Sequence, residues 1–369
     1  MSIKQNKQSK HSFFMKLALM QAQRNLGNTK ENPAVGCVIV KNDCIISAGC
    51  TGINGRPHAE QNAITYSKND IKNSDLYVTL EPCSHYGRTP PCVKTIIRNK
   101  IKRVFFSLND PDRRSYNKST KQLKKNKIRV QNGILGSDIK NFYKSYFKYK
   151  ENILPFVTAK MAISKDFYTN NKKKKWITNK FSRGRVHLMR SNHDCILTSV
   201  NTIIIDNPRF TCRIRGLEDN SPSRIILDKR LKIHITSNIV RSANKYRTII
   251  FFNKIDQKKI KVLKNLKIEL IKIPLSEDGN FDLKYILMKV KILGFSRIFL
   301  ESGLNLTTNF LNKGLVDDFQ LFISSKNLGK NGNNSFKKNM KLFFKNRKFT
   351  NEKVNLFSDK LISYRLNNV

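Results

Sequence analysis

The chain has 369 residues, which is longer than a single hydrophobic core usually grows, so we expect two domains. Hydrophobic residues make up 39% of the chain, which excludes a largely disordered protein, and no apolar run approaches the length of a transmembrane helix. The formal net charge of +45 is spread along the whole sequence rather than collected on one arm. We therefore expect it to attract a phosphorylated substrate rather than to mark a nucleic-acid partner.

Helices and strands alternate through the first 149 residues, which predicts a three-layer α/β domain. Apolar side chains recur at helical spacing from Phe13 to Ala22, after a basic start (residues 1–10) that we expect to be disordered. This apolar run is short and leads directly into a strand, so it is not typical of a targeting segment. The expected strands are 35–40, 44–48, 76–80, 103–107 and 128–130, and the later helices are 59–67, one starting near 92, 116–126 and 138–149.

Three residues of this half have the side chains of a zinc site. His58 opens the second expected helix, and Cys83 and Cys92 follow the third expected strand, at the sheet edge where α/β proteins bind ligands. Catalytic zinc takes three such ligands and keeps a fourth position open for water, whose pKa it lowers. Glu60 is not needed as a ligand and can carry a proton to a leaving amine. We therefore predict one zinc ion on His58, Cys83 and Cys92, with Glu60 as the catalytic residue.

A plainer interpretation exists for each residue alone. A single cysteine is usually a small buried hydrophobe, and a single histidine is usually a satisfied polar residue. The combination with Glu60 favours a metal site. The odd number of cysteines with ligand-like spacing indicates a reducing compartment, so we expect a cytoplasmic location. The remaining cysteines are interpreted as core or incidental residues: Cys37, Cys44, Cys50, Cys195 and Cys212.

The motifs of this half follow a recognisable order: Asn32-Pro33, then His58-Ala59-Glu60, then a segment from Glu81-Pro82-Cys83 to Pro90-Pro91-Cys92. This order resembles the cytidine-deaminase-like superfamily. Zinc deaminases of bases usually separate the two cysteines by two residues, whereas eight separate them here. The longer spacer resembles the bifunctional riboflavin biosynthesis family, in which a pyrimidine deaminase is fused to a reductase.

The resemblance implies the zinc ligands and the role of Glu60 given above. It also implies substrate contacts from Asn32, Arg88 and Asp110, although Asp112 stands where the family more often has Asn. The plainer interpretations are a turn at Asn32, a solvated loop charge at Arg88 and a strand-ending turn at Asp110.

A second α/β pattern follows Pro155, and the charged, aromatic segment 143–152 is interpreted as the link. We therefore expect domains at 1–149 and 150–369. No G-x-G-x-x-G follows a strand, so the usual dinucleotide fingerprint is absent and periodicity alone leaves this domain unassigned. The expected strands are 156–162, 195–199, 225–228, 248–252, 268–273, 297–300 and 319–324, and the helices are 182–191, 282–293 and 306–312.

Short motifs in this half, such as Trp176-Ile177-Thr178, Asp206-Asn207-Pro208 and Glu301-Ser302-Gly303, resemble the family's reductase domain. The resemblance implies a dihydrofolate-reductase-like fold that uses NADPH. Arginines suit a ribose-phosphate substrate because their planar fork binds phosphate oxygens bidentately. The implied cofactor contacts are Ala162, Trp176, Thr202 and Asp206, and the implied substrate contacts are Arg190, Phe210, Arg213 and Glu301. The plainer interpretations are a helix-surface charge at Arg190, a core aromatic at Trp176 and a helix-terminal carboxylate at Glu301.

One turn departs from the family's pattern. The family usually carries Ser-Leu-Asp-Gly after the first strand of the reductase, whereas this chain has Ser164-Lys165-Asp166-Phe167. Loss of the glycine restricts the backbone, so a shifted cofactor loop or a weaker reductase would follow if the turn changed shape. The run Lys172 to Lys175 is interpreted as a solvated hairpin tip rather than a dedicated phosphate site.

The leading hypothesis is therefore a bifunctional enzyme of riboflavin biosynthesis. Its first domain would deaminate diaminohydroxyphosphoribosylaminopyrimidine hydrolytically, and its second would reduce the ribosyl side chain to ribityl with NADPH. The alternative is a nucleic-acid or nucleoside zinc deaminase with a C-terminal binding module, which should show the shorter cysteine spacing and base-stacking aromatics. A third hypothesis is a zinc-stabilised binding protein with a degraded second half. We expect a small-molecule substrate and no nucleic-acid or membrane partner, and a homo-oligomer is left open.

Overall fold

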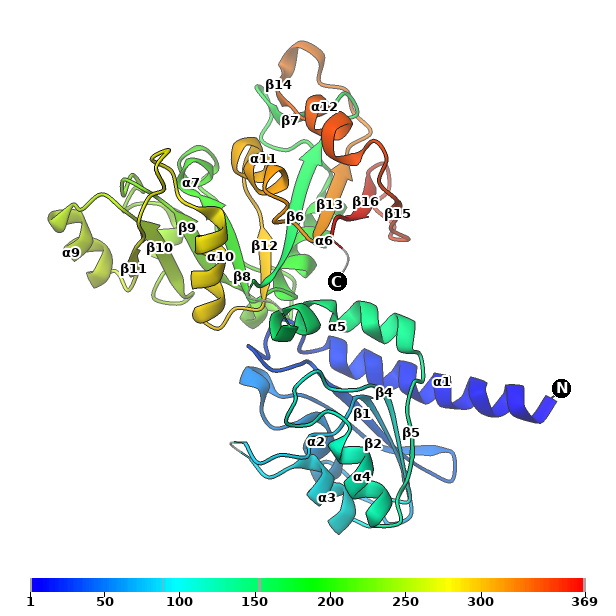
Figure 1. The fold of residues 1–369 in the computed structure, drawn as a ribbon. Helices are drawn as coiled ribbons and strands as arrows, with labels where there is room; N and C mark the ends of the chain where they lie inside the picture. The colour runs from blue at the N-terminus through cyan, green and yellow to red at the C-terminus, as the bar shows by residue number, and fades with distance from the viewer. Residues whose placement is uncertain (1, 88, 152–153, 368–369) are drawn as a thin grey trace. The chain divides into compact units, whose positions relative to one another are not determined.

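The computed structural model describes residues 2–87, 89–151 and 154–367 (Figure 1). The chain divides into two compact units between Asn152 and Ile153. The domain boundary expected at residues 149 and 150 falls inside helix α5 (Gly136–Glu151), which continues to the end of the first unit. No described helix is both long and apolar enough to cross a membrane.

The first unit is built on a five-stranded sheet in the order β2-β1-β3-β4-β5. Strands β3, β4 and β5 run parallel, and β1 is antiparallel to both of its neighbours. Asn42 and Asp43 connect β1 to β2 with φ values of 49° and 67°, the conformation that two-residue hairpin turns require. The strands are β1 (Gly36–Lys41), β2 (Cys44–Cys50), β3 (Asp75–Leu80), β4 (Arg103–Leu108) and β5 (Arg129–Gln131).

Helices cover both faces of this sheet, which confirms the predicted three layers. Helices α2 (Ala59–Thr65), α3 (Cys92–Arg98) and α4 (Lys118–Lys125) bury Ala63, Val93 and Leu123 against one face. Helices α1 (Ser2–Gln23) and α5 bury Met15 and Tyr143 against the other. The short helical turn η1 (Ile53–Gly55) precedes α2.

Two details of this unit differ from expectation. Helix α1 begins at Ser2, so the disordered start predicted for residues 1–10 was wrong for the residues described. Lys and Gln, which are frequent there, are good helix formers, so the helix extends beyond its apolar segment. His58 is the N-cap of α2 rather than part of its first turn.

Helix α2 lies unusually close to strand β2. A Cβ atom placed on Gly49 would lie 2.5 Å from the backbone nitrogen of Ala63 and 2.6 Å from the carbonyl oxygen of Ala59. Real Cβ atoms do not approach backbone atoms that closely, so the position has room only for glycine. Gly49 therefore fixes how deeply the helix that follows His58 can sit.

The second unit has a nine-stranded sheet in the order β11-β10-β9-β8-β12-β6-β13-β16-β15. The strands from β11 to β13 in this order are parallel, whereas β16 and β15 are antiparallel additions at one edge. The strands are β6 (Phe156–Ile163), β8 (Cys195–Ser199), β9 (Ser223–Leu227), β10 (Thr248–Phe252), β11 (Glu269–Lys272), β12 (Arg297–Leu300), β13 (Asp318–Ile323), β15 (Phe349–Asn351) and β16 (Lys360–Arg365). Strands β7 (Tyr168–Asn171) and β14 (Gly332–Ser335) form a separate antiparallel pair.

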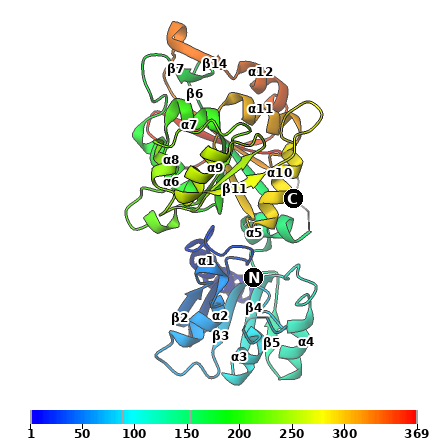
Figure 2. The same cartoon turned by 90° about the vertical axis from the view of Figure 1, so that its left-hand side faces the viewer.

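Helices also cover both faces of the larger sheet. Figure 2 shows α6, α8 and α9 together on one face, where they share a core with α7. Helices α10 and α11 pack on the opposite core. Helices α7, α8 and α9 were not expected from the sequence. The helices are α6 (Lys180–Ser191), α7 (Val200–Asp206), α8 (Asn238–Arg241), α9 (Gln257–Asn265), α10 (Leu283–Ile292), α11 (Leu304–Asn312) and α12 (Lys337–Asn339), with shorter turns η2 (Glu218–Asn220), η3 (Gly329–Asn331) and η4 (Met340–Phe344).

Candidate active sites

His58, Cys83 and Cys92 come together just beyond the carboxyl end of β3. His58 Nδ1 lies 3.4 Å from Cys83 Sγ and 3.2 Å from Cys92 Sγ, and one donor atom from each residue lies within 4.8 Å of the others. The backbone N–H of Cys92, at the start of α3, donates to Cys83 Sγ over 3.3 Å. A hydrogen bond from Cys92 lowers the pKa of the Cys83 thiol to about 4, and His58 acts in the same direction against the effect of burial. One imidazole nitrogen and two sulfur atoms in this geometry fit a zinc ion.

Glu60 lies in the first turn of α2, two residues beyond His58, and is 4% exposed. Burial raises the pKa of its carboxyl group to about 7, although the neighbouring His58 acts in the opposite direction. A carboxyl group with a pKa near neutrality can both accept and donate a proton at physiological pH. Glu60 therefore has the property that the predicted proton carrier needs.

The structure gives the contacts of two of the three residues that are predicted to bind the deaminase substrate. Asn32 packs against Gly55, where an added Cβ would lie 2.2 Å from Asn32 Nδ2. Asp110 is 7% exposed, and its Oδ1 accepts hydrogen bonds from the Tyr146 hydroxyl over 2.9 Å and the Asp112 backbone N–H over 3.0 Å. Burial raises the pKa of Asp110 to about 6. Arg88 lies outside the described residues. Substrate contact by these residues stays a prediction.

The second unit contains a cavity of about 680 Å³, a size typical of sites for small molecules and cofactors. It lies where β6, β8 and β12 reach their carboxyl ends, the usual ligand-binding edge of a parallel sheet. The fold brings together residues that are far apart in sequence. All the predicted reductase residues line the cavity: Ala162, Trp176, Arg190, Thr202, Asp206, Phe210, Arg213 and Glu301.

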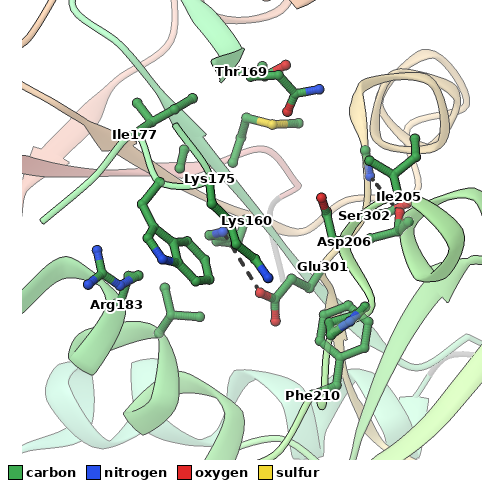
Figure 3. Close-up of a pocket in the computed structure, with 18 of the residues that line it drawn as sticks. Lys160, Thr169, Lys175, Ile177, Arg183, Ile205, Asp206, Phe210, Glu301 and Ser302 are labelled. Atoms are coloured by element: carbon green, nitrogen blue, oxygen red, sulfur yellow. Dashed lines mark hydrogen bonds and ion pairs between the residues drawn. The ribbon is translucent and has the colours of Figure 1, made fainter. Parts of the chain in front are cut away.

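An ion pair joins α6 to the end of β12 inside this cavity. Arg190 donates to Glu301 through Nη2 over 2.8 Å and through Nε over 2.9 Å, and Lys160 Nζ lies 3.9 Å from the same carboxylate. Figure 3 shows Lys160 and Glu301 pointing toward each other. Burial alone would raise the pKa of Glu301, but Arg190 and Lys160 outweigh it and hold the pKa below its ordinary value. Arg190 is 9% exposed, so its interpretation as a helix-surface charge is wrong.

The predicted cofactor residues lie on other walls of the cavity. Thr202 Oγ1 accepts a hydrogen bond of 3.3 Å from the Gly303 backbone N–H, which ties α7 to the start of α11. Trp176 is 55% exposed, so it is not a core aromatic. Two cations lie near its ring, with Lys175 Nζ at 5.5 Å and Arg183 Cζ at 4.9 Å from the centroid. Burial raises the pKa of Asp206.

The turn from Ser164 to Phe167 keeps a glycine-like conformation despite its sequence. Phe167 has a φ of 69°, in the left-handed region, and its side chain packs against the core of the unit. The Asp166 carboxylate accepts backbone N–H groups from Leu328 over 3.0 Å and Gly329 over 2.8 Å. The turn is therefore anchored. Of the neighbouring lysines, Lys172 to Lys174 are exposed beyond β7, whereas Lys175 lines the cavity.

The cavity also contains residues for which no role was predicted. Lys160 interrupts the apolar sequence of β6, and a lysine within a buried strand was the available signal. His187 lies one helical turn before Arg190, and its Nδ1 lies 2.9 Å from the Thr211 carbonyl oxygen and 3.2 Å from the Arg213 backbone nitrogen. Burial lowers the pKa of His187 to about 4, so the ring is neutral near pH 7.

Family models and individual relatives match both units. Residues 8–108 match the cytidine and deoxycytidylate deaminase zinc-binding region, and residues 155–361 match the RibD C-terminal domain. The riboflavin biosynthesis protein RibD of Aquifex aeolicus is 35% identical over 319 residues, covering 86% of this chain and 87% of that protein. The corresponding protein of Actinobacillus pleuropneumoniae is 33% identical over 318 residues, covering 86% and 84%.

A solved structure extends the likeness to three dimensions. The crystal structure of a diaminohydroxyphosphoribosylaminopyrimidine deaminase/5-amino-6-(5-phosphoribosylamino)uracil reductase from Thermotoga maritima is 29% identical to this chain. It superimposes with a TM-score of 0.83, covering 98% of this chain and 100% of that one.

A zinc-binding deaminase unit followed by a reductase unit defines a bifunctional deaminase–reductase. The chain belongs to the RibD family of riboflavin biosynthesis proteins. It is an enzyme with a zinc-dependent deaminase and an NADPH-dependent reductase, as predicted. The alternative of a nucleic-acid deaminase is not favoured, because the second half matches a reductase domain rather than a binding module.

Proposed function

We propose that this protein carries out two steps of riboflavin biosynthesis on one phosphoribosylated pyrimidine. The first unit would remove an amino group from diaminohydroxyphosphoribosylaminopyrimidine, and the second unit would reduce the ribosyl side chain of the product to ribityl. The observation that carries the proposal is the pairing, in one chain, of the His58, Cys83 and Cys92 cluster with the cavity around Arg190 and Glu301. The Thermotoga maritima protein, named as a diaminohydroxyphosphoribosylaminopyrimidine deaminase and 5-amino-6-(5-phosphoribosylamino)uracil reductase, supports the choice of substrate.

In the deaminase unit, His58, Cys83 and Cys92 would hold the zinc ion through one nitrogen and two sulfur atoms. A bound zinc ion lowers the pKa of a water molecule and so supplies a nucleophile near neutral pH. Glu60, with its pKa of about 7, would accept a proton from that nucleophile and deliver it to the leaving amino group. The water oxygen would bond to the ring carbon that carries the amino group, one water proton would go to the adjacent ring nitrogen, and the other would go to the amino group. The carbon–nitrogen bond would then break, ammonia would depart, and a carbonyl oxygen would take the place of the amino group.

Three further residues would bind the pyrimidine in the deaminase unit: Asn32, Arg88 and Asp110. Asn32 is supported by its place against Gly55, in the loop that leads to His58. Asp110 follows β4, next to β3 in the sheet, and its carboxylate has both a backbone N–H and a tyrosine hydroxyl to fix it. Each would orient the ring rather than take part in proton transfer.

In the reductase unit, Ala162, Trp176, Thr202 and Asp206 would contact NADPH, and Arg190, Phe210, Arg213 and Glu301 would contact the substrate. Arg190 is already paired with Glu301, which makes Arg213 the better partner for the substrate phosphate. Reduction adds a hydride to the carbon that links ribose to nitrogen, and the ring oxygen takes up one proton to become a hydroxyl. Lys160, whose pKa is lowered by burial, lines the same cavity and would supply that proton.

The partner of the enzyme is a small-molecule pyrimidine, and we propose a cytoplasmic location. The described cysteines are free thiols rather than disulfides, which favours a reducing compartment.

Metal removal tests the division of labour between the two units. We expect about one zinc ion per purified chain, measured by elemental analysis. A chelator should abolish ammonia release but leave NADPH oxidation intact when the deaminated substrate is supplied, and added zinc should restore ammonia release. Ammonia release by metal-free protein, or equal loss of both activities, would contradict the proposal.

A further inference from the structure

One wall of the reductase cavity is a strained loop. Residues 207–210 follow α7 and line the cavity, and two of them, Asn207 and Phe210, have φ values of 40° and 52° without being glycine. Asn207 is the C-cap of α7, where asparagine adopts this conformation readily, so the strain lies at Phe210. A left-handed phenylalanine costs about 1–3 kcal/mol and persists only where the surrounding structure holds it. Contacts from behind the loop must therefore fix this wall.

Asn238, the first residue of α8, holds one end of the loop. Its backbone N–H donates to Asn207 Oδ1 over 2.8 Å, and its Nδ2 donates to the Asn207 carbonyl oxygen over 2.8 Å. These two bonds fix both the side chain and the backbone of Asn207. The left-handed conformation of Asn207 is thus supported directly.

Arg224 holds the other end of the loop. It lies on β9, is 0% exposed, and is not one of the described residues that line the cavity. Its Nη1 donates to the Arg209 carbonyl oxygen over 3.3 Å, immediately before the strained Phe210. Its other acceptors are Ser242 Oγ at 2.8 Å, Thr248 Oγ1 at 2.6 Å and the carbonyl oxygens of Ile239 at 3.1 Å, Tyr246 at 3.0 Å and Ser242 at 3.2 Å.

These acceptors are carbonyl and hydroxyl oxygens, so a buried cation is stabilised here without a carboxylate. Burial lowers the pKa of Arg224 to about 10, and the group remains charged near pH 7. Burying a charge is costly, and an apolar side chain would fill the same volume at less cost. An apolar side chain could not make the hydrogen bonds that join the cavity loop to α8 and to the segment 242–248.

The loop in turn fixes the ion pair of the cavity. Phe210 is 3% exposed, and its ring centroid lies 5.5 Å from Arg190 Cζ. The carbonyl oxygen of Thr211 accepts a hydrogen bond of 3.1 Å from Arg190 Nη1. A shift of the loop would therefore move two of the groups that orient Arg190 toward Glu301.

We propose that Arg224 is a positioning residue for the reductase step, which acts by holding the loop 207–210 in the conformation that orients Phe210, Arg190 and Arg213. This inference rests on the function proposed for the cavity. Arg224 would thus contribute to the reductase step although it contacts neither the substrate nor the cofactor.

The test compares Arg224→Met and Arg224→Lys in the full-length, zinc-loaded enzyme. Methionine leaves the acceptors unpaired, whereas lysine keeps the charge but cannot reach all of them. We expect kcat/KM for the phosphoribosyl substrate to fall about tenfold to a hundredfold for methionine, mainly through KM, and less for lysine. The dissociation constant of NADPH should stay within about twofold, because Arg224 contacts the loop at Arg209, next to the substrate residue Phe210, whereas Asn238 holds the end next to Asp206. Trp176 is the only tryptophan of the chain and lines the cavity, so its fluorescence reports NADPH binding without turnover.

Arg247→Met is the matched control. Arg247 comes directly before β10 in the same sheet, its guanidinium pairs with Glu269 over 2.7 Å and 3.0 Å, and it is not among the described cavity residues. It should leave both ligand affinities unchanged. If Arg224→Met fails to fold, Arg224→Lys and Ser242→Ala, which removes one acceptor, carry the test.

Folded Arg224 variants with an unchanged substrate KM would overturn the proposal. Equal weakening of substrate and NADPH binding would also overturn it, because Arg224 would then be a general stabiliser of the fold. If NADPH does not quench the fluorescence of Trp176 even in the wild-type protein, the cavity is not the NADPH site. The function proposed for the cavity is then wrong, and the role of Arg224, which rests on that function, is wrong as well.

Discussion

The two sites place a buried glutamate in opposite electrostatic settings. In the deaminase unit burial dominates at Glu60, so its pKa rises to about 7. In the reductase unit the Glu301 side chain is 13% exposed, and burial again acts to raise its pKa, but Arg190 and Lys160 outweigh it and lower the pKa below the ordinary value. The first carboxyl group can exchange a proton at neutral pH, whereas the second stays ionised and holds cations in place. The difference shows that the neighbours of a buried carboxylate, rather than its depth, decide its chemistry.

Of the changes that test this difference between the two glutamates, Glu60→Gln should have the largest effect on activity. Glutamine keeps the size of the side chain but cannot carry the proton, so ammonia release should fall by about 10²–10⁴-fold. Zinc content and NADPH oxidation with the deaminated substrate should stay at wild-type values. Glu301→Gln is the matched change in the other unit, and it should impair reduction while sparing ammonia release. Persistent ammonia release by Glu60→Gln would remove that residue from proton transfer.

Arg190→Ala tests how strongly Glu301 depends on its neighbouring cations, because it leaves this carboxylate without its main partner. The free energy of unfolding of the second unit should fall by about 3 kcal/mol, at the low end for a broken buried pair because the cavity admits water. Denaturant titration followed by Trp176 fluorescence would measure it. The double variant with Glu301→Ala should lose clearly less than the sum of the single changes. Simple additivity would show that the pair is not coupled.

Asp110→Asn tests whether burial alone sets a carboxyl pKa in the first unit. The pKa of Asp110 is raised to about 6, so the folded state binds this proton more tightly than the unfolded state. Its contribution to stability is therefore complete below about pH 4 and is lost as pH rises to about 6. Asparagine keeps the acceptor oxygen without a charge and should be more stable than wild type by about 3 kcal/mol at pH 7, which is the free energy that corresponds to raising the carboxyl pKa from its ordinary value to about 6.

The measurement is thermal or denaturant unfolding of both proteins at several pH values. The difference between them should grow between about pH 4 and 6 and then level off. A difference that does not change with pH would mean that Asp110 titrates normally in the folded protein.

Phe167→Gly should have the smallest effect. A non-glycine residue in the left-handed region costs about 1 kcal/mol, and the substitution would remove that strain together with the packing of the ring. The two terms oppose each other, so stability should change by less than about 1 kcal/mol. Because the turn already has its glycine-like shape, reductase kcat should change by less than about twofold. A large gain in kcat would show that the phenylalanine distorts the cofactor loop.

The deaminase cluster could be predicted from the sequence because its members lie between residues 58 and 92, in motifs whose spacing is itself informative. The main strands were predictable for a similar reason, since their apolar runs are continuous. Strands β7, β14 and β15 were missed because Tyr168–Asn171, Gly332–Ser335 and Phe349–Asn351 are largely polar or exposed and carry no buried hydrophobic pattern. Strand β16 was also missed, although its Leu361 and Tyr364 are buried.

The reductase cavity could not be predicted from the sequence and became visible only in the folded structure. Its walls come from β6, β8 and β12, which are neighbours in space but separated in sequence by other elements. The resemblance supplied its residues, yet the partners of Arg224 are mostly backbone carbonyl oxygens, which no residue type reveals. Likewise, the left-handed conformation of Phe167 could not be predicted, because sequence preference argues against it.

The close approach of α2 to β2 has a consequence for metal selectivity. Gly49 sets the depth of the helix whose N-cap is His58, so it controls how far the imidazole nitrogen reaches toward Cys83 and Cys92. Ions that differ in radius and preferred geometry require different distances between these donors. A single methyl group at position 49 would push the backbone of Ala59 and Ala63 away from β2, and it would therefore disturb the position of His58 without changing any ligand residue.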